Sequence, residues 1–83
     1  MTLNEIFLGM DVPAIQNKDF TQLRRDAIRI RNNISYNVGR EILKEFYEVF
    51  HTDVEGLIMR VRNDEIQLKD TLVQIYNFLS ERL

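Results

Sequence analysis

The chain has 83 residues, with 13 acidic and 11 basic side chains, a formal net charge of −2 and no cysteine. This length suits one domain, and so short a chain buries only about 60% of the surface that its unfolded form exposes, so self-association would add stability. The lack of cysteine excludes disulfide bonds and thiolate metal ligands and is typical of a reducing compartment. We therefore expect a single helical domain over residues 1–83.

The apolar runs are short. The longest are a few residues, as in Ile6-Phe7-Leu8, whereas a helix that spans a bilayer needs about 20 apolar residues. The first ten residues carry an acid and no Lys or Arg ahead of their apolar side chains, so the basic start of a signal peptide is missing. These features predict a cytoplasmic protein without a membrane span.

Two short helical segments are expected near the N-terminus. Thr2 with Glu5 three residues later is a capping-box pattern, which predicts a helix over about residues 3–8. Its buried side chains would be Leu3, Ile6 and Phe7. Pro13 then suits the first position of a helix because its φ angle is fixed, and we expect one further turn over residues 14–16.

The longest helix-period pattern begins after Asp19, which forms an N-cap pattern with Gln22. Apolar side chains spaced by three and four residues form one stripe: Phe20, Leu23, Ala27, Ile30 and Ile34. Short polar side chains and a glycine, which are poor residues for the interior of a helix, then crowd residues 32–39. They predict a break or a kink, and the pattern leaves open whether this segment kinks one helix or separates two.

Residues 40–50 resume the helical pattern with an unusually broad apolar face. Its side chains are Ile42, Leu43, Phe46, Tyr47, Val49 and Phe50. A face this broad buries against more than one neighbour, so the segment is either the centre of the core or a core face combined with a partner-binding face.

Two helices are predicted in the C-terminal part. Thr52 with Glu55 matches a capping box and predicts a helix over about residues 53–62, in which Gly56 either weakens the helix or permits close helix contact. Asp64 opens a helix that runs almost to the C-terminus. The stripe of this helix is Leu68, Leu72, Ile75 and Leu79, flanked by Val73, Tyr76 and Phe78. Such a helix either lies deep in the domain or meets another chain, as in a homodimer.

These elements predict an all-α fold, a compact bundle of about four to five helices, two of them short. One proline and three glycines leave little room for β-hairpins.

The chain offers little for catalysis. It has one histidine and no cysteine, and no pattern of a catalytic triad, phosphate loop or calcium loop appears. His51 lies near Asp53 and Glu55, but a histidine at a helix C-terminus is favoured by the helix dipole without any ligand. We therefore expect no enzyme activity, no catalytic residue, no metal ligand and no cofactor.

The charges are distributed unevenly. The segment from Lys18 to Arg31 is basic and the segment from Glu41 to Glu55 is acidic, which favours two antiparallel segments whose charges pair within the chain or across a dimer. Four arginines also suggest an alternative function, nucleic-acid binding: Arg24, Arg25, Arg29 and Arg31. At 100° per residue they form no single patch, and the sequence pI of about 5.3 is acidic, so this alternative ranks second.

A protein partner is the first-ranked prediction. Tyrosines bury a ring while their hydroxyl stays in water, a property enriched at protein interfaces. The candidate partner-binding residues lie mostly off the main stripes: Ile28, Tyr47, Val73 and Tyr76.

The segments MTLNEIFLGM and IRNNISYNVGREILKEF belong to a small, acidic chain rich in Asn, Ile, Phe and basic residues. In style and length the chain resembles the accessory regulators of large tailed phages, such as the cytoplasmic antiholins of T-even phages. The resemblance implies binding to the cytoplasmic part of a holin and a delay of lysis. The sequence thus predicts a small non-enzymatic regulator that binds a protein through a helical face.

Overall fold

The computed structural model describes residues 1–59 and 64–83. This part of the chain contains helices and no strands, which confirms the predicted all-α class. The elements are α1 (Leu3–Ile6), the 3₁₀ helix η1 (Val12–Asn17), α2 (Phe20–Asn37), α3 (Glu41–Phe50), α4 (Val54–Met59) and α5 (Glu65–Ser80).

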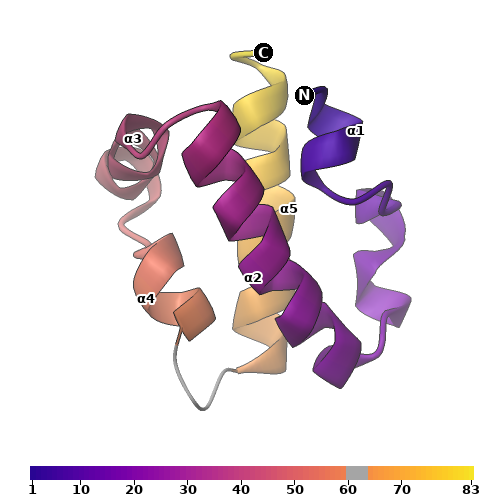
Figure 1. Cartoon of the computed structure of the whole chain (residues 1–83). Coiled ribbons are helices and arrows are strands. Elements are labelled where there is room, and N and C mark those ends of the chain that lie inside the picture. Colours follow the sequence, from indigo (N-terminus) through magenta and orange to yellow (C-terminus); the bar gives the residue numbers. More distant parts are fainter. Residues whose placement is uncertain (60–63) are drawn as a thin grey trace.

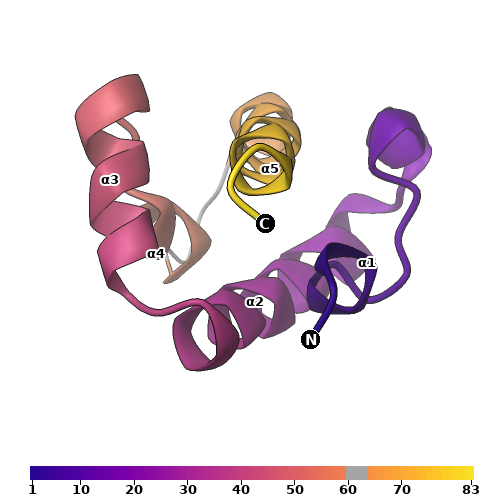
Figure 2. The same ribbon diagram turned by 90° about the horizontal axis from the view of Figure 1, so that it is seen from above.

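Helix α5 stands at the centre of the bundle (Figures 1 and 2). Helix α2 covers one of its sides, α3 and α4 a second, and α1 with η1 a third (Figure 2). Seven residues of α5 are buried, more than in any other described helix, and the exposed residues of its middle, Asp70, Gln74 and Asn77, are polar. Helix α5 therefore lies deep in the domain, which is one of the two arrangements expected for it. Helix α3 is peripheral and is not the centre of the core.

One continuous core holds the elements together. Every helix contributes to it, and its buried apolar side chains are Ile6, Phe7, Met10, Val12, Ile15, Leu23, Ala27, Ile30, Ile34, Leu43, Phe46, Val54, Leu57, Ile58, Leu68, Leu72, Ile75, Phe78 and Leu79. The stripe predicted for residues 20–34 and the one predicted for residues 68–79 both face this core, apart from Phe20, which is only partly buried.

The predicted N-caps of three helices are confirmed. The Thr2 hydroxyl accepts a hydrogen bond from the Glu5 amide, and the Glu5 carboxylate accepts one from the Thr2 amide. Asp19 accepts from the amide of Gln22 at 3.0 Å, and Asp64 caps α5 in the same way. Helix α1 ends at Ile6, two residues before the predicted end, because the next turn places Leu8 and Gly9 in the left-handed region with φ of +59° and +69°.

The fourth predicted cap, at Thr52, is wrong. The side chain of Asp53 accepts the hydrogen bond from the Gly56 amide at 3.0 Å, while the Thr52 hydroxyl donates to the carbonyl of Phe50. A Cβ added at Gly56 would lie 2.5 Å from Oδ2 of Asp53, so Gly56 leaves room for this cap rather than for a neighbouring helix. The predicted end of this helix, at residue 62, lies outside the described residues.

Helix α2 continues through most of the segment where a break or kink was expected. Asn33 donates from its side-chain amide to the carbonyl of Ile6 at 3.0 Å, and Asn37 donates to the carbonyl of Asn33 at 2.9 Å. These acceptors satisfy the amides that would otherwise disfavour a helix. The chain breaks after Asn37 instead, where Gly39 has a φ of +110°, so the segment separates two helices at its end.

Helix α3 leaves this turn at a steep angle to α2 instead of lying antiparallel to it (Figures 1 and 2). One ion pair joins the basic and the acidic segment in the described part of the chain, between Arg31 and Glu55 at 3.0 Å. Lys18 and Lys44 find acids within their own segments, Asp26 at 3.7 Å and Glu41 at 3.9 Å. The predicted pairing between the segments therefore holds for one pair only.

Candidate protein-binding surface

Helix α3 has an apolar face that the domain covers only in its middle. Leu43 and Phe46 are buried, whereas Val49 is 56% exposed and Tyr47 is 52% exposed on the two edges of the face. Phe50, near the C-terminal end of the helix, is also exposed. Three large apolar side chains within four residues are thus exposed on one helix, so residues 40–50 are not the centre of the core.

Aromatic rings hold α3 against the end of α5. The Phe46 ring meets the Phe78 ring edge-on with centroids 5.4 Å apart, and Phe50 stacks on Phe46 at 4.6 Å. Arg82 adds a polar contact, since its Nε donates to Glu45 at 3.1 Å while its guanidinium lies 3.4 Å from the centroid of the Phe78 ring. The exposed face is therefore presented by an anchored helix.

A hollow of about 620 Å³ lies beside this face, between α3 and the start of α4. Its apolar lining residues are Leu43, Tyr47 and Val54, and its charged lining residues are Arg40, Lys44, Glu48, Asp53 and Glu55. Five of its eight lining residues are charged, so the hollow combines a small apolar part with charges of both signs. We call this site, together with the exposed residues Tyr47, Val49 and Phe50, the α3 surface.

A second hollow of about 290 Å³ lies between the C-terminal half of α2 and the residue before α3. Its lining is Arg31, Asn32, Ser35, Tyr36 and Arg40. Arg40 lines both hollows, so the two adjoin at the turn that separates α2 from α3.

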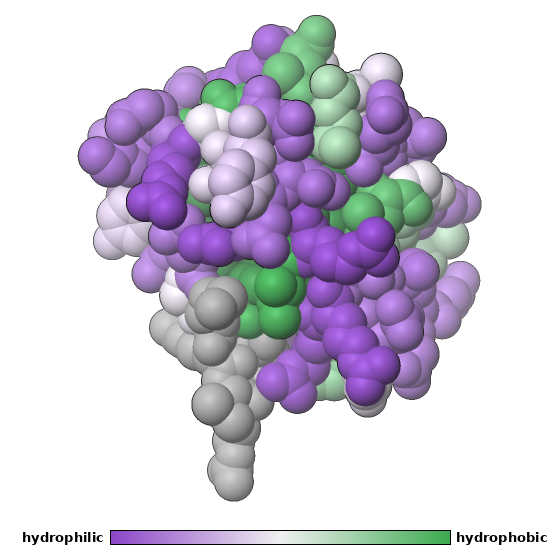
Figure 3. All heavy atoms as spheres, in the orientation of Figure 1, coloured by the Kyte–Doolittle hydropathy of each residue, from purple (hydrophilic) through white to green (hydrophobic). Residues whose placement is uncertain are grey.

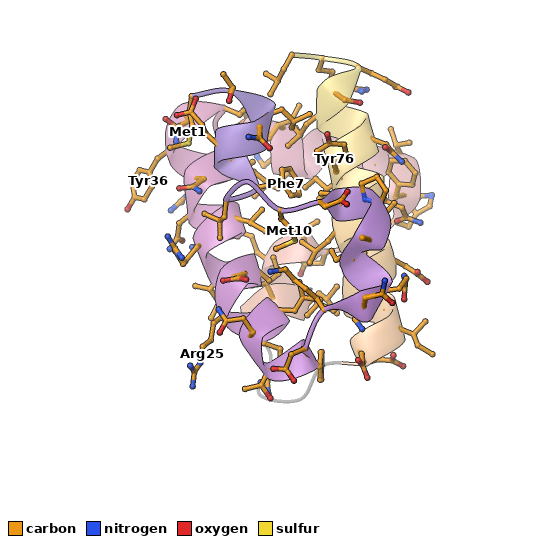
Figure 4. The ribbon with its side chains drawn as sticks, turned by 90° about the vertical axis from the view of Figure 1, so that its right-hand side faces the viewer. Met1, Phe7, Met10, Arg25, Tyr36 and Tyr76 are labelled. Carbon is orange, nitrogen blue, oxygen red and sulfur yellow. The ribbon has the colours of Figure 1, made fainter. Side chains whose placement is uncertain are left out.

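The four residues predicted for partner binding do not meet at one place. Tyr47 lines the larger hollow, and Ile28 is 40% exposed on α2. Val73 and Tyr76 are partly buried on α5, where the Tyr76 ring packs edge-on against Phe7 with centroids 5.1 Å apart (Figure 4). Among the four, Tyr47 alone belongs to the α3 surface.

The four arginines predicted for nucleic-acid binding are also divided. Arg31 pairs with Glu55, and the Arg24 guanidinium lies 5.9 Å from the centroid of the Phe20 ring. Arg25 and Arg29 are exposed on the opposite side of α2. The face of the molecule that carries α2 is largely hydrophilic, with small separate apolar areas (Figure 3).

The sequence patterns missed Val49, Phe50 and Arg40 as site residues. Val49 and Phe50 belong to the broad apolar face of residues 40–50, and the helical period of such residues is the same whether they are covered or open. The width of the apolar face could have indicated that some of these residues are exposed, because a helix at the edge of a small bundle can bury only part of so broad a face.

Residues 1–59 and 64–83 hold no group of three or more His, Asp or Glu side chains that could bind a metal ion. One carboxyl in this part has a resolved pKa shift: hydrogen bonds from the backbone and the hydroxyl of Thr2 lower the pKa of Glu5, which lies in the N-cap of α1. Among the helices that the structure describes, none is long and apolar enough to cross a membrane.

Comparisons with known proteins give no relative from which a function could be transferred. No family model matches the chain, and no curated protein and no solved structure matches it. The resemblance to phage regulators therefore stays a prediction, and the geometry of the α3 surface is the basis for a function.

Proposed function

We propose that this protein is a non-enzymatic regulator that binds another protein through the α3 surface. The observation that supports this most directly is the exposure of Tyr47 and Val49 on a helix that is anchored elsewhere by Phe46. Burial of apolar side chains is favourable by about 25 cal/mol per Å², so a helix that keeps such residues in water is suited to a partner.

The lining of the larger hollow indicates what the partner presents. Leu43, Tyr47 and Val54 suit an aliphatic or aromatic side chain inserted between α3 and α4. Acids and bases both surround this apolar part, with Arg40 and Lys44 on one helix row and Asp53 at the start of α4. A partner segment with an apolar anchor and flanking charges of both signs fits, and the charges would select its orientation.

The proposed location and partner rest on the amino-acid sequence. We propose a cytoplasmic location, and the resemblance to the small regulators of large tailed phages makes the cytoplasmic part of a holin the first partner to test. Self-association through the middle of α5 is not part of this proposal, because the exposed residues there are polar.

The test is an affinity capture from the lysate of the native host, with and without nuclease, using the wild type, Tyr47→Ser and Val49→Ser. We expect a protein partner that survives nuclease and is lost with both variants. Ile66→Ser is the matched control, because Ile66 is 70% exposed at the start of α5, away from the α3 surface. Circular dichroism verifies that each variant is folded. Retention by folded Tyr47→Ser and Val49→Ser at the wild-type level would refute the proposed surface.

The alternative function is nucleic-acid binding. Arg25 and Arg29 lie one helical turn apart, are exposed, and make no ion pair with the described residues. This alternative predicts an affinity that falls steeply with salt concentration, since phosphate contacts release counterions. Capture that disappears with nuclease and with the double variant Arg25→Ala, Arg29→Ala would favour it over the α3 surface.

A further inference from the structure

The smaller hollow has a lining that is almost entirely made of hydrogen-bond donors. Its residues are two arginines, an asparagine, a serine and a tyrosine, and no acidic side chain lines it. We propose that this hollow is a binding site for a phosphoryl group, as found on a phosphate monoester. It lies beside the α3 surface and shares Arg40 with the larger hollow, whereas Tyr47, Val49 and Phe50 are not among its lining residues.

Arg40 supplies the free charge. It is exposed, and its side chain makes no hydrogen bond or ion pair with residues 1–59 or 64–83. Arg40 is also the residue before the first turn of α3, where no side chain caps the helix. The N-terminus of a ten-residue helix carries a partial positive charge, which adds to that of Arg40, while Glu41 in the first turn offsets part of it.

Arg31 supplies fixed geometry. Its two terminal nitrogens donate to Glu55 at 3.0 Å and to Asn32 at 2.9 Å, which hold the guanidinium at the wall of the hollow. A guanidinium has five N–H groups, so donors remain after these two bonds, and Nε of Arg31 is buried without a hydrogen-bond partner among the described residues. Glu55 offsets the charge of Arg31 but lines the other hollow.

The remaining donors favour a phosphoryl group over a carboxylate. Ser35 and Tyr36, whose side chains carry hydroxyls, line the same hollow, and Tyr36 is 87% exposed. A carboxylate offers two oxygens in a plane, whereas a phosphoryl group offers three oxygens in different directions. Donors from α2 and from the start of α3 can therefore act on it together.

The experiment is a titration of the 83-residue protein with inorganic phosphate at constant ionic strength, followed by the NMR amide shifts of residues 31–43. We expect saturable shifts centred on Arg40, binding about tenfold weaker in Arg40→Ala, and partial recovery in Arg40→Lys. Arg25→Ala is the matched control, because Arg25 lies at the opposite end of α2 from Tyr36 (Figure 4), and it should bind as the wild type does.

Three further ligands test which kind of molecule carries the group that the hollow binds. Phosphoserine tests a phosphoryl group on a side chain, acetate tests a carboxylate, and a single-stranded oligonucleotide tests a phosphodiester backbone. Phosphate and phosphoserine should bind, and acetate should bind more weakly. Equal loss of binding in Arg25→Ala and Arg40→Ala, unchanged binding in Arg40→Ala, or binding by the oligonucleotide alone would each overturn the site. Failure here leaves the capture experiment with Tyr47 and Val49 variants unaffected.

Discussion

Buried Lys69 and Asp26 are each held by specific hydrogen-bond partners. Lys69 is buried on α5, and its Nζ donates to the carbonyl of Gln16 and to Glu65, both at 2.9 Å. On α2, buried Asp26 accepts from the side-chain amide of Gln22 at 3.1 Å. The lysine joins segments 53 residues apart in the sequence, so it fixes the position of η1 on the central helix.

We predict that Lys69→Met lowers the free energy of unfolding by about 1–2 kcal/mol, because the Gln16 carbonyl loses a charged donor in a partly buried place. Urea denaturation followed by circular dichroism measures this change. Lys44→Met is the control, since Lys44 and its partner Glu41 are both largely exposed, and it should stay within about 0.5 kcal/mol of the wild type. Equal effects of the two substitutions would contradict the role of Lys69.

The N-cap of α1 contains a carboxyl, that of Glu5, whose pKa depends on the folded structure. Hydrogen bonds from the Thr2 amide and hydroxyl lower the pKa of Glu5 below its ordinary value in the folded protein. A group with a lowered folded pKa stabilises the fold above its ordinary pKa, and this contribution is lost as the pH falls through the folded pKa. An NMR titration of the Glu5 carboxyl should therefore show a low midpoint that rises in Thr2→Ala. Thr2→Ala keeps the backbone amide donor, so the rise should be partial. Thr2→Ser, which keeps the hydroxyl as well, should retain the low midpoint, and an unchanged midpoint in Thr2→Ala would show that the hydroxyl does not lower the pKa of Glu5.

Helix α3 is held against the C-terminal end of α5 by Arg82, which follows that helix. Arg82 joins Glu45 of α3, the Phe78 ring and the Phe78 carbonyl, so one side chain connects three groups. Helix α3 buries only Leu43 and Phe46, so the contacts of Arg82 are a large share of what holds α3 to α5.

We predict that Arg82→Ala increases hydrogen exchange of the amides in residues 41–50 more than that of the amides in residues 20–37. The guanidinium–ring contact and the partly exposed ion pair are together worth about 1 kcal/mol, and their loss falls on α3 first. Arg29→Ala removes an exposed arginine that makes no ion pair with the described residues, and it should leave exchange unchanged. Uniform exchange across the protein in Arg82→Ala would show that α3 does not open on its own.

At the scale of the whole molecule, stability depends on one helix. Helix α5 packs against η1, α1 and α4, and its buried side chains lie at the centre of the core. A domain of this size has a free energy of unfolding of only about 4–12 kcal/mol, so the loss of one central contact is a large fraction of it.

We predict that Leu72→Ala, at a position that is 1% exposed, lowers the free energy of unfolding by about 2–5 kcal/mol through lost burial and a cavity. Gln74→Ala, on the exposed side of the same helix, should change it by less than about 0.5 kcal/mol. Thermal denaturation compares the two. Similar melting temperatures would mean that α5 is not the centre of the core.

Much of the local structure followed from the sequence. The caps at Thr2, Asp19 and Asp64 and the stripes of α2 and α5 depend on residues within a few positions of one another, and their patterns predicted them. Thr52 does not cap α4, because the carboxylate of Asp53, one residue later, accepts the hydrogen bond from the Gly56 amide, and a glycine at position 56 leaves room for that carboxylate. Asn33 failed as a helix breaker because its acceptor, the carbonyl of Ile6, lies 27 residues away.

Short-range spacing and the 3.6-residue period were enough to predict the all-α class, the caps of three helices and the side chains that share an apolar stripe. The packing of the helices places α5 at the centre and α3 at the periphery, leaves Val49 and Phe50 exposed, and brings Arg31 and Arg40 to one hollow. A helix has the same apolar period whether its face is covered or open, and the direction in which the chain leaves Gly39 determines which faces meet.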